Sequence, residues 1–169
     1  MQLFFKKILT IILCLFLCSC SLNFKKNDKN EKYLNLMETL TLHDESLFVH
    51  SSKVFDISFE CSNTPSGYRY YVVVDNPRYA MYGVSVLAIV VDNDYSEEMA
   101  ANAGIFEDVA YNLVPGQTLL ENGYVKGISV SGIVKSETPP ILKVVVQYHS
   151  YKQEVKQEYF IYDFSEDGE

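Results

Sequence analysis

Acidic side chains at alternate positions suggest metal chemistry in one part of the chain. Asp92, Asp94 and Ser96 have the spacing that opens a calcium-binding loop. The pattern then stops, because Glu97 stands where such a loop needs glycine and Ala103 where it needs a bidentate glutamate. We therefore interpret this stretch as a solvated acidic loop and predict no calcium site in it.

A second group of residues combines imidazole and carboxylate side chains: His43, Asp44, Glu45 and His50. Two histidines that share a metal on one helix are usually about four residues apart, whereas these two are seven apart. We interpret the group as surface residues. The sequence therefore predicts neither a metal ion nor a cofactor.

Cys61 is the one residue whose thiol could act as a nucleophile in the folded domain. Catalysis would require His43, His50 or His149 beside it, together with a third group that orients the histidine. The local sequence offers no such arrangement, nor does it contain a nucleophile elbow, a phosphate loop or a dinucleotide fingerprint. We predict that Cys61 is buried and inert and that the chain is not an enzyme.

Five tyrosines form the candidate binding patch: Tyr68, Tyr70, Tyr71, Tyr79 and Tyr82. Strand alternation would place Tyr68 and Tyr70 on one face of a sheet and Tyr71 on the other. An exposed group of tyrosines could bind a protein or stack on sugar rings, since each ring combines apolar area with a polar tip. The simpler alternative, which the pattern favours, is that these tyrosines close the edges of the core.

The first twenty residues contain a targeting signal. Lys6 and Lys7 precede an apolar stretch over 8–17, which has the length of a signal-peptide core and is shorter than the roughly 20 residues that span a bilayer. The sequence Leu17-Cys18-Ser19-Cys20 resembles the lipobox of bacterial lipoproteins. This resemblance implies cleavage before Cys20 and acylation of its thiol. It also implies an extracytoplasmic protein that is lipid-anchored to a bacterial membrane, either the cell membrane or the outer membrane.

Charge limits the partners of the remaining chain. Loss of residues 1–19 leaves about 150 residues, enough for one domain with a core. With 12 basic and 22 acidic residues, their net charge is −10. This balance argues against nucleic acid and against anionic head groups, so we expect membrane contact through the N-terminal lipid alone. Because Cys61 is then the only thiol left, no intrachain disulfide is expected.

Composition divides the chain into four parts. We predict a signal peptide over 1–19, the lipidated cysteine and a flexible polar tether over 20–32, a single domain over 33–164 and an acidic tail over 165–169. The segment 33–50 fits a short amphipathic helix and an alternating strand equally well, so its type stays open.

Most of the domain shows the alternation of β-strands. Strands are predicted over 54–60, 68–75, 82–91, 108–114, 124–135, 142–148 and 155–161, the last two as a hairpin. Between them, Ser96 as a helix cap and Gly104 as a stop predict one or two helical turns.

About seven short strands at regular spacing predict an antiparallel β-sandwich of two sheets. The strand rhythm of the last hundred residues resembles that of bacterial immunoglobulin-like domains, although the paired cysteines and core tryptophan of antibody domains are missing.

Three functions follow from these predictions. The first is a non-enzymatic binding module for an envelope protein, a host protein or a glycan. The alternative is a structural or accessory subunit of an envelope transport or secretion complex. A hydrolase or metal-dependent enzyme ranks third. An exposed patch would favour the binding module, and an open sheet edge would favour the complex subunit. A deep pocket would favour the enzyme.

Overall fold

The computed structural model describes residues 28–42, 44–119 and 122–166. The predicted signal peptide, the sequence that resembles a lipobox and Cys20 lie outside these residues. Contacts between residues divide the chain into two units, Met1–Asn35 and Leu36–Glu169. The described part of the first unit, residues 28–35, is helical, and the second unit contains the sheets.

The segment that the sequence left open is helical over its first part. Residues 28–42 form a helix, so residues 28–32 of the expected tether are helical too. Leu36 and Leu40 are buried whereas Leu42 is exposed, which is the spacing of an amphipathic helix and not that of a strand. A short 3₁₀ helix, Glu45–Leu47, and strand β1, Phe48–Val49, complete the segment.

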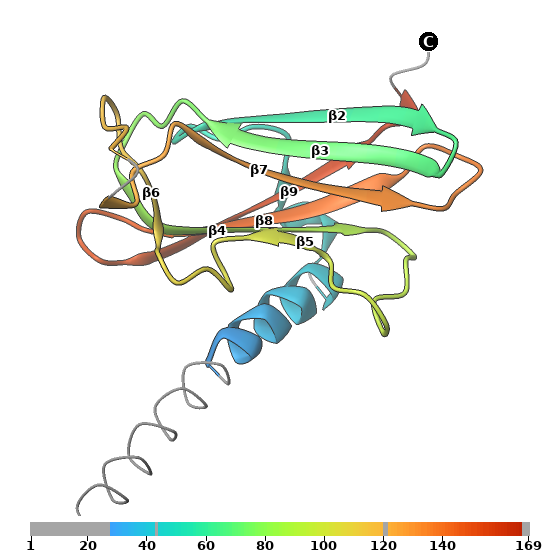
Figure 1. Ribbon diagram of the computed structural model, residues 1–169, viewed down its shortest axis with the longest axis horizontal. Coiled ribbons are helices and arrows are strands. Elements are labelled where there is room, and N and C mark those ends of the chain that lie inside the picture. Colours follow the sequence, from blue (N-terminus) through green and yellow to red (C-terminus); the bar gives the residue numbers. More distant parts are fainter. Residues whose placement is uncertain (1–27, 43, 120–121, 167–169) are drawn as a thin grey trace, which may run out of the picture. The chain divides into compact units, whose positions relative to one another are not determined.

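Two sheets make up the rest of the chain (Figure 1). The smaller sheet has the order β2-β3-β7, with bounds Asp56–Thr64, Gly67–Asp75 and Gly127–Val134. The larger sheet has the order β1-β9-β8-β4-β5, in which β9 is Val155–Asp163, β8 is Ile141–His149, β4 is Met81–Val90 and β5 is Ala101–Ala103. Strand β6, Tyr111–Leu113, pairs with the start of β4. Every pairing between these strands is antiparallel except β1 with β9.

The predicted β-sandwich is confirmed. In chain order, β2 and β3 enter the smaller sheet, β4 the larger, β7 the smaller, and β8 and β9 the larger. This is the order of immunoglobulin-like sandwiches, in which strands A, B and E lie opposite strands C, F and G. The described residues form nine strands: the seven predicted ones, of which β6 is only three residues long, and two further strands of two and three residues, β1 and β5.

The main core lies between the two sheets. Phe55 is fully buried there, and its ring packs edge-on against those of Tyr148 and Phe160 at centroid distances of 6.3 and 5.8 Å. On the other face of the larger sheet, Leu87 and Val145 are fully buried as well. A strand with both faces covered explains why the sequence of β4 is almost continuously apolar.

The helical turns predicted for residues 96–104 are wrong. Residues 96–98 form a bend, and Ala101–Ala103 pair with β4 as strand β5. Ser96 does not cap a helix, because its backbone N–H and its hydroxyl both donate to the carboxylate of Asp94. Gly104 has a φ of 75° beside the carbonyl of Val84, so it ends a strand and not a helix.

Candidate binding surface

The structure separates the five tyrosines of the predicted patch. Tyr70 lies in the core and is 3% exposed, Tyr68 packs against the core, and Tyr71 lies on the opposite face of β3. Tyr82 is half-buried on β4. Tyr79 lies in the loop between β3 and β4 and is 67% exposed. Burial raises the pKa of the Tyr70 phenol far above its ordinary value. Of the five, Tyr79 is the most available to a partner.

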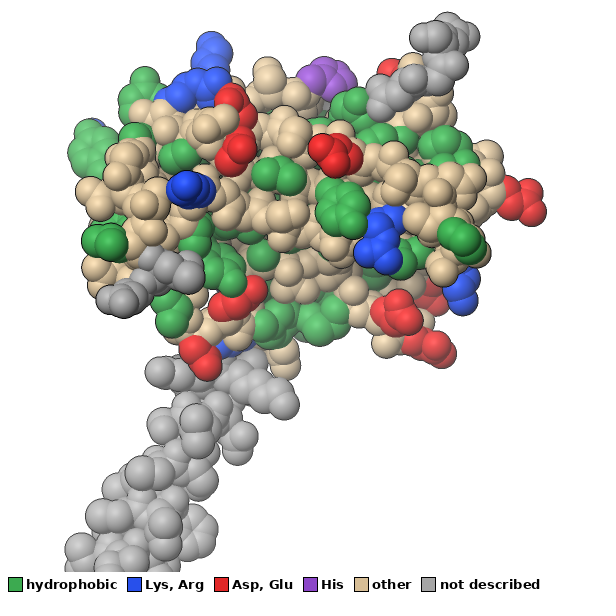
Figure 2. Space-filling model, turned by 45° about the horizontal axis from the view of Figure 1, so that its top comes forward, with side chains coloured by type: hydrophobic (Ala, Val, Ile, Leu, Met, Phe, Trp, Pro, Cys, Tyr) green, Lys and Arg blue, Asp and Glu red, His purple; other side chains and the backbone are tan. Residues whose placement is uncertain are grey.

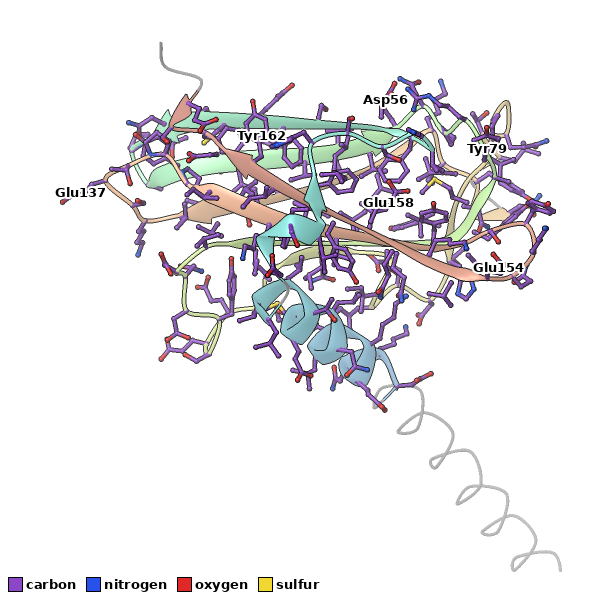
Figure 3. All side chains as sticks on the ribbon, turned by 180° about the vertical axis from the view of Figure 1, so that it is seen from behind. Asp56, Tyr79, Glu137, Glu154, Glu158 and Tyr162 are labelled. Atoms are coloured by element: carbon purple, nitrogen blue, oxygen red, sulfur yellow. The ribbon has the colours of Figure 1, made fainter. Side chains whose placement is uncertain are left out.

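Tyr79 lies at an end of the sandwich where three loops meet. In the larger sheet Tyr82 of β4 stands opposite His149 of β8, and Met81 stands opposite Leu113 of β6. The loops 76–80, 114–123 and 150–154 therefore leave the sheet from neighbouring positions. We call these three loops, without the undescribed residues 120–121, the loop end. Figure 3 shows Tyr79 and Glu154 together at this end.

Among its described residues, each loop carries one large exposed hydrophobic side chain. Tyr79, Leu119 and Tyr151 are 67%, 62% and 72% exposed. Tyrosine is well suited to contact a partner, since it offers a large rigid area and loses little conformational entropy when it is fixed. Sequence reasoning missed Leu119 and Tyr151, because only the pairing of β4 with β6 and β8 brings their loops beside Tyr79.

The loop that carries Tyr79 is held by Asp56 at the start of β2. The Arg78 guanidinium donates a hydrogen bond to Asp56 Oδ1 at 2.6 Å, and the Asn76 amide donates to Asp56 Oδ2 at 3.2 Å. The backbone N–H of Arg78 also donates to the carbonyl of Val54 at 2.7 Å. The Arg78 and Asn76 hydrogen bonds lower the pKa of Asp56 from its ordinary value, so the carboxylate is charged at neutral pH.

The loop that carries Tyr151 is a tight turn between β8 and β9. The N–H of Ser150 donates to the carbonyl of Glu154 at 2.9 Å, and the N–H of Gln153 donates to the carbonyl of Ser150 at 2.8 Å. Gln153 has a φ of 63°, which closes the turn. The ammonium of Lys152 lies 5.6 Å from the centroid of the Tyr151 ring, close enough for a cation–π contact.

Asn112 fastens the third loop to β4. Its side-chain oxygen accepts a hydrogen bond from the N–H of Gly83 at 3.0 Å, and its backbone N–H donates to the carbonyl of Gly123 at 2.7 Å. The N–H of Tyr124 donates to the carbonyl of Leu119 at 3.2 Å. Hydrogen bonds thus hold the described backbone of the three loops before any partner arrives.

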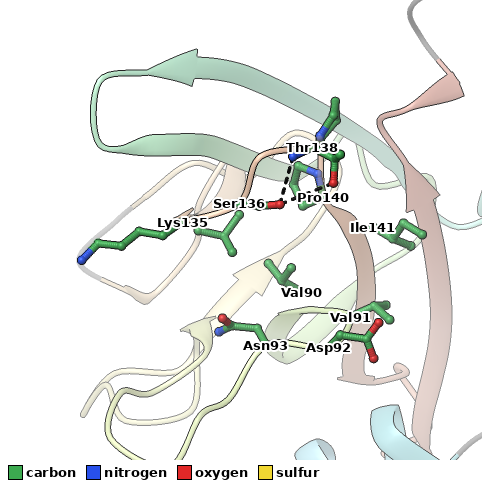
Figure 4. A pocket seen from close by; sticks show the side chains of 11 residues that line it. Val90, Val91, Asp92, Asn93, Lys135, Ser136, Thr138, Pro140 and Ile141 are labelled. Atoms are coloured by element: carbon green, nitrogen blue, oxygen red, sulfur yellow. Dashed lines mark hydrogen bonds between the residues drawn. The ribbon is translucent and has the colours of Figure 1, made fainter.

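A hollow of about 320 Å³ lies at the far end of β4 (Figure 4). Residues 90–93, 134–136 and 138–141 line it. Ser136 Oγ accepts a hydrogen bond from the N–H of Thr138 at 3.2 Å, so the segment that leads into β8 is turned on itself. Asp92 and Lys135 are the charged residues of this lining, and neither a histidine nor a cysteine belongs to it.

The residues that suggested metal or thiol chemistry are placed as follows. Asp94 accepts from Ser96 and Asp44 from Ser46, and these hydrogen bonds lower the pKa of each carboxyl. His50 is exposed, whereas His43 and the Glu45 side chain lie outside what the structure describes. Cys61, predicted to be buried, is partly exposed, and burial of part of its surface raises the pKa of the thiol. Among the described residues, no three or more His, Cys, Asp or Glu side chains are grouped to hold a metal ion.

Within the described ranges no helix is both long enough and apolar enough to span a membrane. No protein-family model, curated protein or solved structure that was compared with the chain matches it.

Proposed function

We propose that the chain is a lipid-anchored, extracytoplasmic binding module that holds a partner protein at its loop end. One observation carries this proposal: three large side chains, Tyr79, Leu119 and Tyr151, are exposed on three adjoining loops whose described backbone is held by hydrogen bonds. The resemblance of residues 17–20 to a lipobox supports the anchor. The net charge of −10 that remains after loss of residues 1–19 argues for a protein partner over a nucleic acid.

Fixed loops favour binding because less order has to be imposed when the complex forms. Each side chain or loop residue that becomes immobile on binding costs about 0.5–1.5 kcal/mol, and a prearranged surface avoids part of that cost. A protein surface fits the arrangement better than a sugar does, since a sugar ring needs one flat aromatic platform whereas these side chains project from three separate loops.

The test is site-specific photo-crosslinking in intact cells that produce the full chain. The photoreactive amino acid p-benzoylphenylalanine replaces Tyr79, Tyr151 or, as a control, Glu137. Glu137 is exposed at the opposite end of the sandwich (Figure 3). We expect the same protein to be captured from positions 79 and 151 and not from 137. Equal capture from position 137, or no captured protein at 79 and 151, contradicts the proposal.

The captured protein then allows a measurement of affinity. We expect Tyr79→Ala and Tyr151→Ala each to weaken its binding about tenfold, the effect of losing roughly 1.4 kcal/mol from a central contact. Tyr71→Ala is the matched control, because Tyr71 is a half-buried tyrosine on the outer face of β3. A loss at Tyr71 as large as at Tyr151 would move the binding surface back to the smaller sheet.

A further inference from the structure

A second hollow, of about 450 Å³, opens beside strand β2, away from the loop end. Its lining consists of Phe59, Glu60, Cys61, Tyr68, Pro139 and Phe164. The Phe59 ring stacks on that of Tyr162 at a centroid distance of 4.7 Å, and the Tyr162 ring meets that of Phe164 at 4.8 Å. Three of the six lining residues, Phe59, Tyr68 and Phe164, are aromatic, so this aromatic hollow can accept an apolar side chain.

Strand β2 forms an edge of the smaller sheet along its whole length. It pairs with β3 in unbroken register from Asp56 opposite Asp75 to Thr64 opposite Gly67. Among the described strands, β3 is the only one that pairs with it. Sheet edges are usually protected by charged side chains, above all lysine, by proline, by a bulge or by a very short strand. These nine residues contain no lysine, proline or bulge, and their charged side chains are Asp56 at the start of the strand and Glu60 on its outer face. Every second backbone N–H and C=O of β2 thus points to the open side.

Side chains on the two faces of β2 differ in character. Ile57, Phe59 and Cys61 point inward and pack against the core. By contrast, Ser58, Glu60 and Ser62 are exposed on the outer face. Figure 2 shows a face of the molecule on which isolated apolar side chains lie among polar ones. A strand laid along β2 would alternate in the same way. Its inward side chains would enter the aromatic hollow, and its outward side chains would lie beside Glu60.

We propose that the open edge of β2 binds an extended segment of a partner protein in which apolar side chains alternate with basic ones. Main-chain hydrogen bonds would supply the affinity, and the hollow and Glu60 would select the side chains. Charge separates this occupant from a second copy of the chain. Each copy has a net charge of −10 after the leader is removed, so two copies repel each other. If β2 of a second copy lay along this edge, it would bring no basic residue to pair with Glu60. This site goes beyond the proposed function, because it lies outside the loop end.

The test uses a labelled peptide, Ser-Val-Lys-Phe-Lys-Val-Ser, and the full chain kept reduced in a nonionic detergent. Fluorescence anisotropy measures the binding. Two further peptides have the same sequence and carry N-methyl groups on alternate amides. In one peptide the methyl groups block the hydrogen bonds of one edge of the extended strand, and in the other they block those of the opposite edge. Because an added strand uses one of its edges, we expect one methylated peptide to lose binding and the other to keep it within about threefold.

Variants of the chain locate the peptide. We expect Phe59→Ala, which removes a wall of the hollow, to weaken binding about tenfold. Ile133→Ala is the matched control, since Ile133 is an exposed apolar residue on β7, the opposite edge of the same sheet. The variant Tyr79→Ala/Tyr151→Ala should leave peptide binding unchanged, which keeps this result separate from the fate of the loop end. Hydrogen exchange should slow at alternate amides of β2.

Several results overturn the inference. Equal binding of both methylated peptides would show apolar attraction without strand addition. Equal weakening by Phe59→Ala and Ile133→Ala would place the peptide elsewhere, and so would unchanged exchange along β2. A dimer of the reduced chain that disappears in Phe59→Ala would identify a second copy as the occupant.

Discussion

Asp56 fixes a loop that lies twenty residues further along the sequence. The side chains of Asn76 and Arg78 both donate to its carboxylate, and Tyr79 follows directly. Exposed ion pairs usually contribute little to the stability of a whole protein. Here the ion pair between Asp56 and Arg78 has a local effect, because it sets the position of Tyr79, which we assign to binding.

We expect Asp56→Ala to release this loop without unfolding the sandwich. The backbone amide of Arg78, which donates to Val54, should exchange its hydrogen roughly two- to fivefold faster, in line with the loss of an exposed ion pair. Asp94→Ala is the matched control, since Asp94 is also an exposed carboxylate with a lowered pKa but holds only Ser96. An Arg78 amide that responds equally to both variants would show that Asp56 does not fix the loop.

The same loop should loosen in acid. Arg78 and Asn76 lower the pKa of Asp56 below its ordinary value of 3.8, so the unfolded chain binds this proton more readily than the folded chain does. The contribution of Asp56 is therefore complete above pH 3.8 and is lost as the pH falls through the lower pKa of the folded chain. Measured against Asp56→Ala at each pH, the extra protection of the Arg78 amide should disappear over that range. Protection that persists at the lowest pH would contradict this explanation.

For single residues, the sequence predicted which side chains share a face but not which face is covered. Alternation correctly separated Tyr71 from Tyr68 and Tyr70. Only the second sheet decides that Tyr70 is inside, and only the pairing of β4 with β8 brings Tyr151 close to Tyr79. The candidate surface therefore depends on contacts between residues far apart in the chain, which a local pattern does not contain.

Among the secondary-structure elements, the long strands and the short β6 were predictable, whereas the short strands β1 and β5 were not. The alternation that defines β2, β3, β8 and β9 is present within each strand. By contrast, β5 is three residues long and exists because β4 offers it an edge. Its sequence, flanked by Ser96 and Gly104, has the local features of a helix, and tertiary contacts override them.

Gly104 illustrates this point and allows a test of it. At its φ of 75°, a β-carbon would collide with the carbonyl oxygen of Val84, whereas Gly116 has the same φ and no atom within 4 Å of such a carbon. We expect Gly116→Ala to lower the free energy of unfolding by about 1–2 kcal/mol through backbone strain alone. Gly104→Ala should cost at least about 2 kcal/mol more, because β5 must also move away from β4. Urea unfolding curves measure both, and equal losses would contradict the packing seen at β5.

On the scale of the whole molecule, charge and the resemblance to a lipobox favour the same mode of attachment, which stays a prediction. Without residues 1–19 the chain would have a net charge of −10 and would be repelled by anionic head groups, so an anchor would have to come from apolar insertion. Each buried methylene contributes about 0.8 kcal/mol, and one acyl chain alone gives only reversible binding. Durable attachment would thus require two or more acyl chains, which is what the resemblance to a lipobox implies for Cys20.

Cys20 is the residue on which this proposed attachment depends, and its neighbour provides the control. We expect Cys20→Ala to abolish incorporation of an alkyne-labelled fatty acid and Cys18→Ala to leave it unchanged, although both thiols lie within the same four residues. The labelled chain should stay with the membrane in about 1 M salt, which shortens the screening length to roughly 3 Å and removes head-group attraction. Labelling that survives Cys20→Ala, or release of the wild-type chain by salt, would show that something other than a lipid on Cys20 holds the domain at the membrane. The tyrosines of the loop end would then need a different explanation for how they meet their partner.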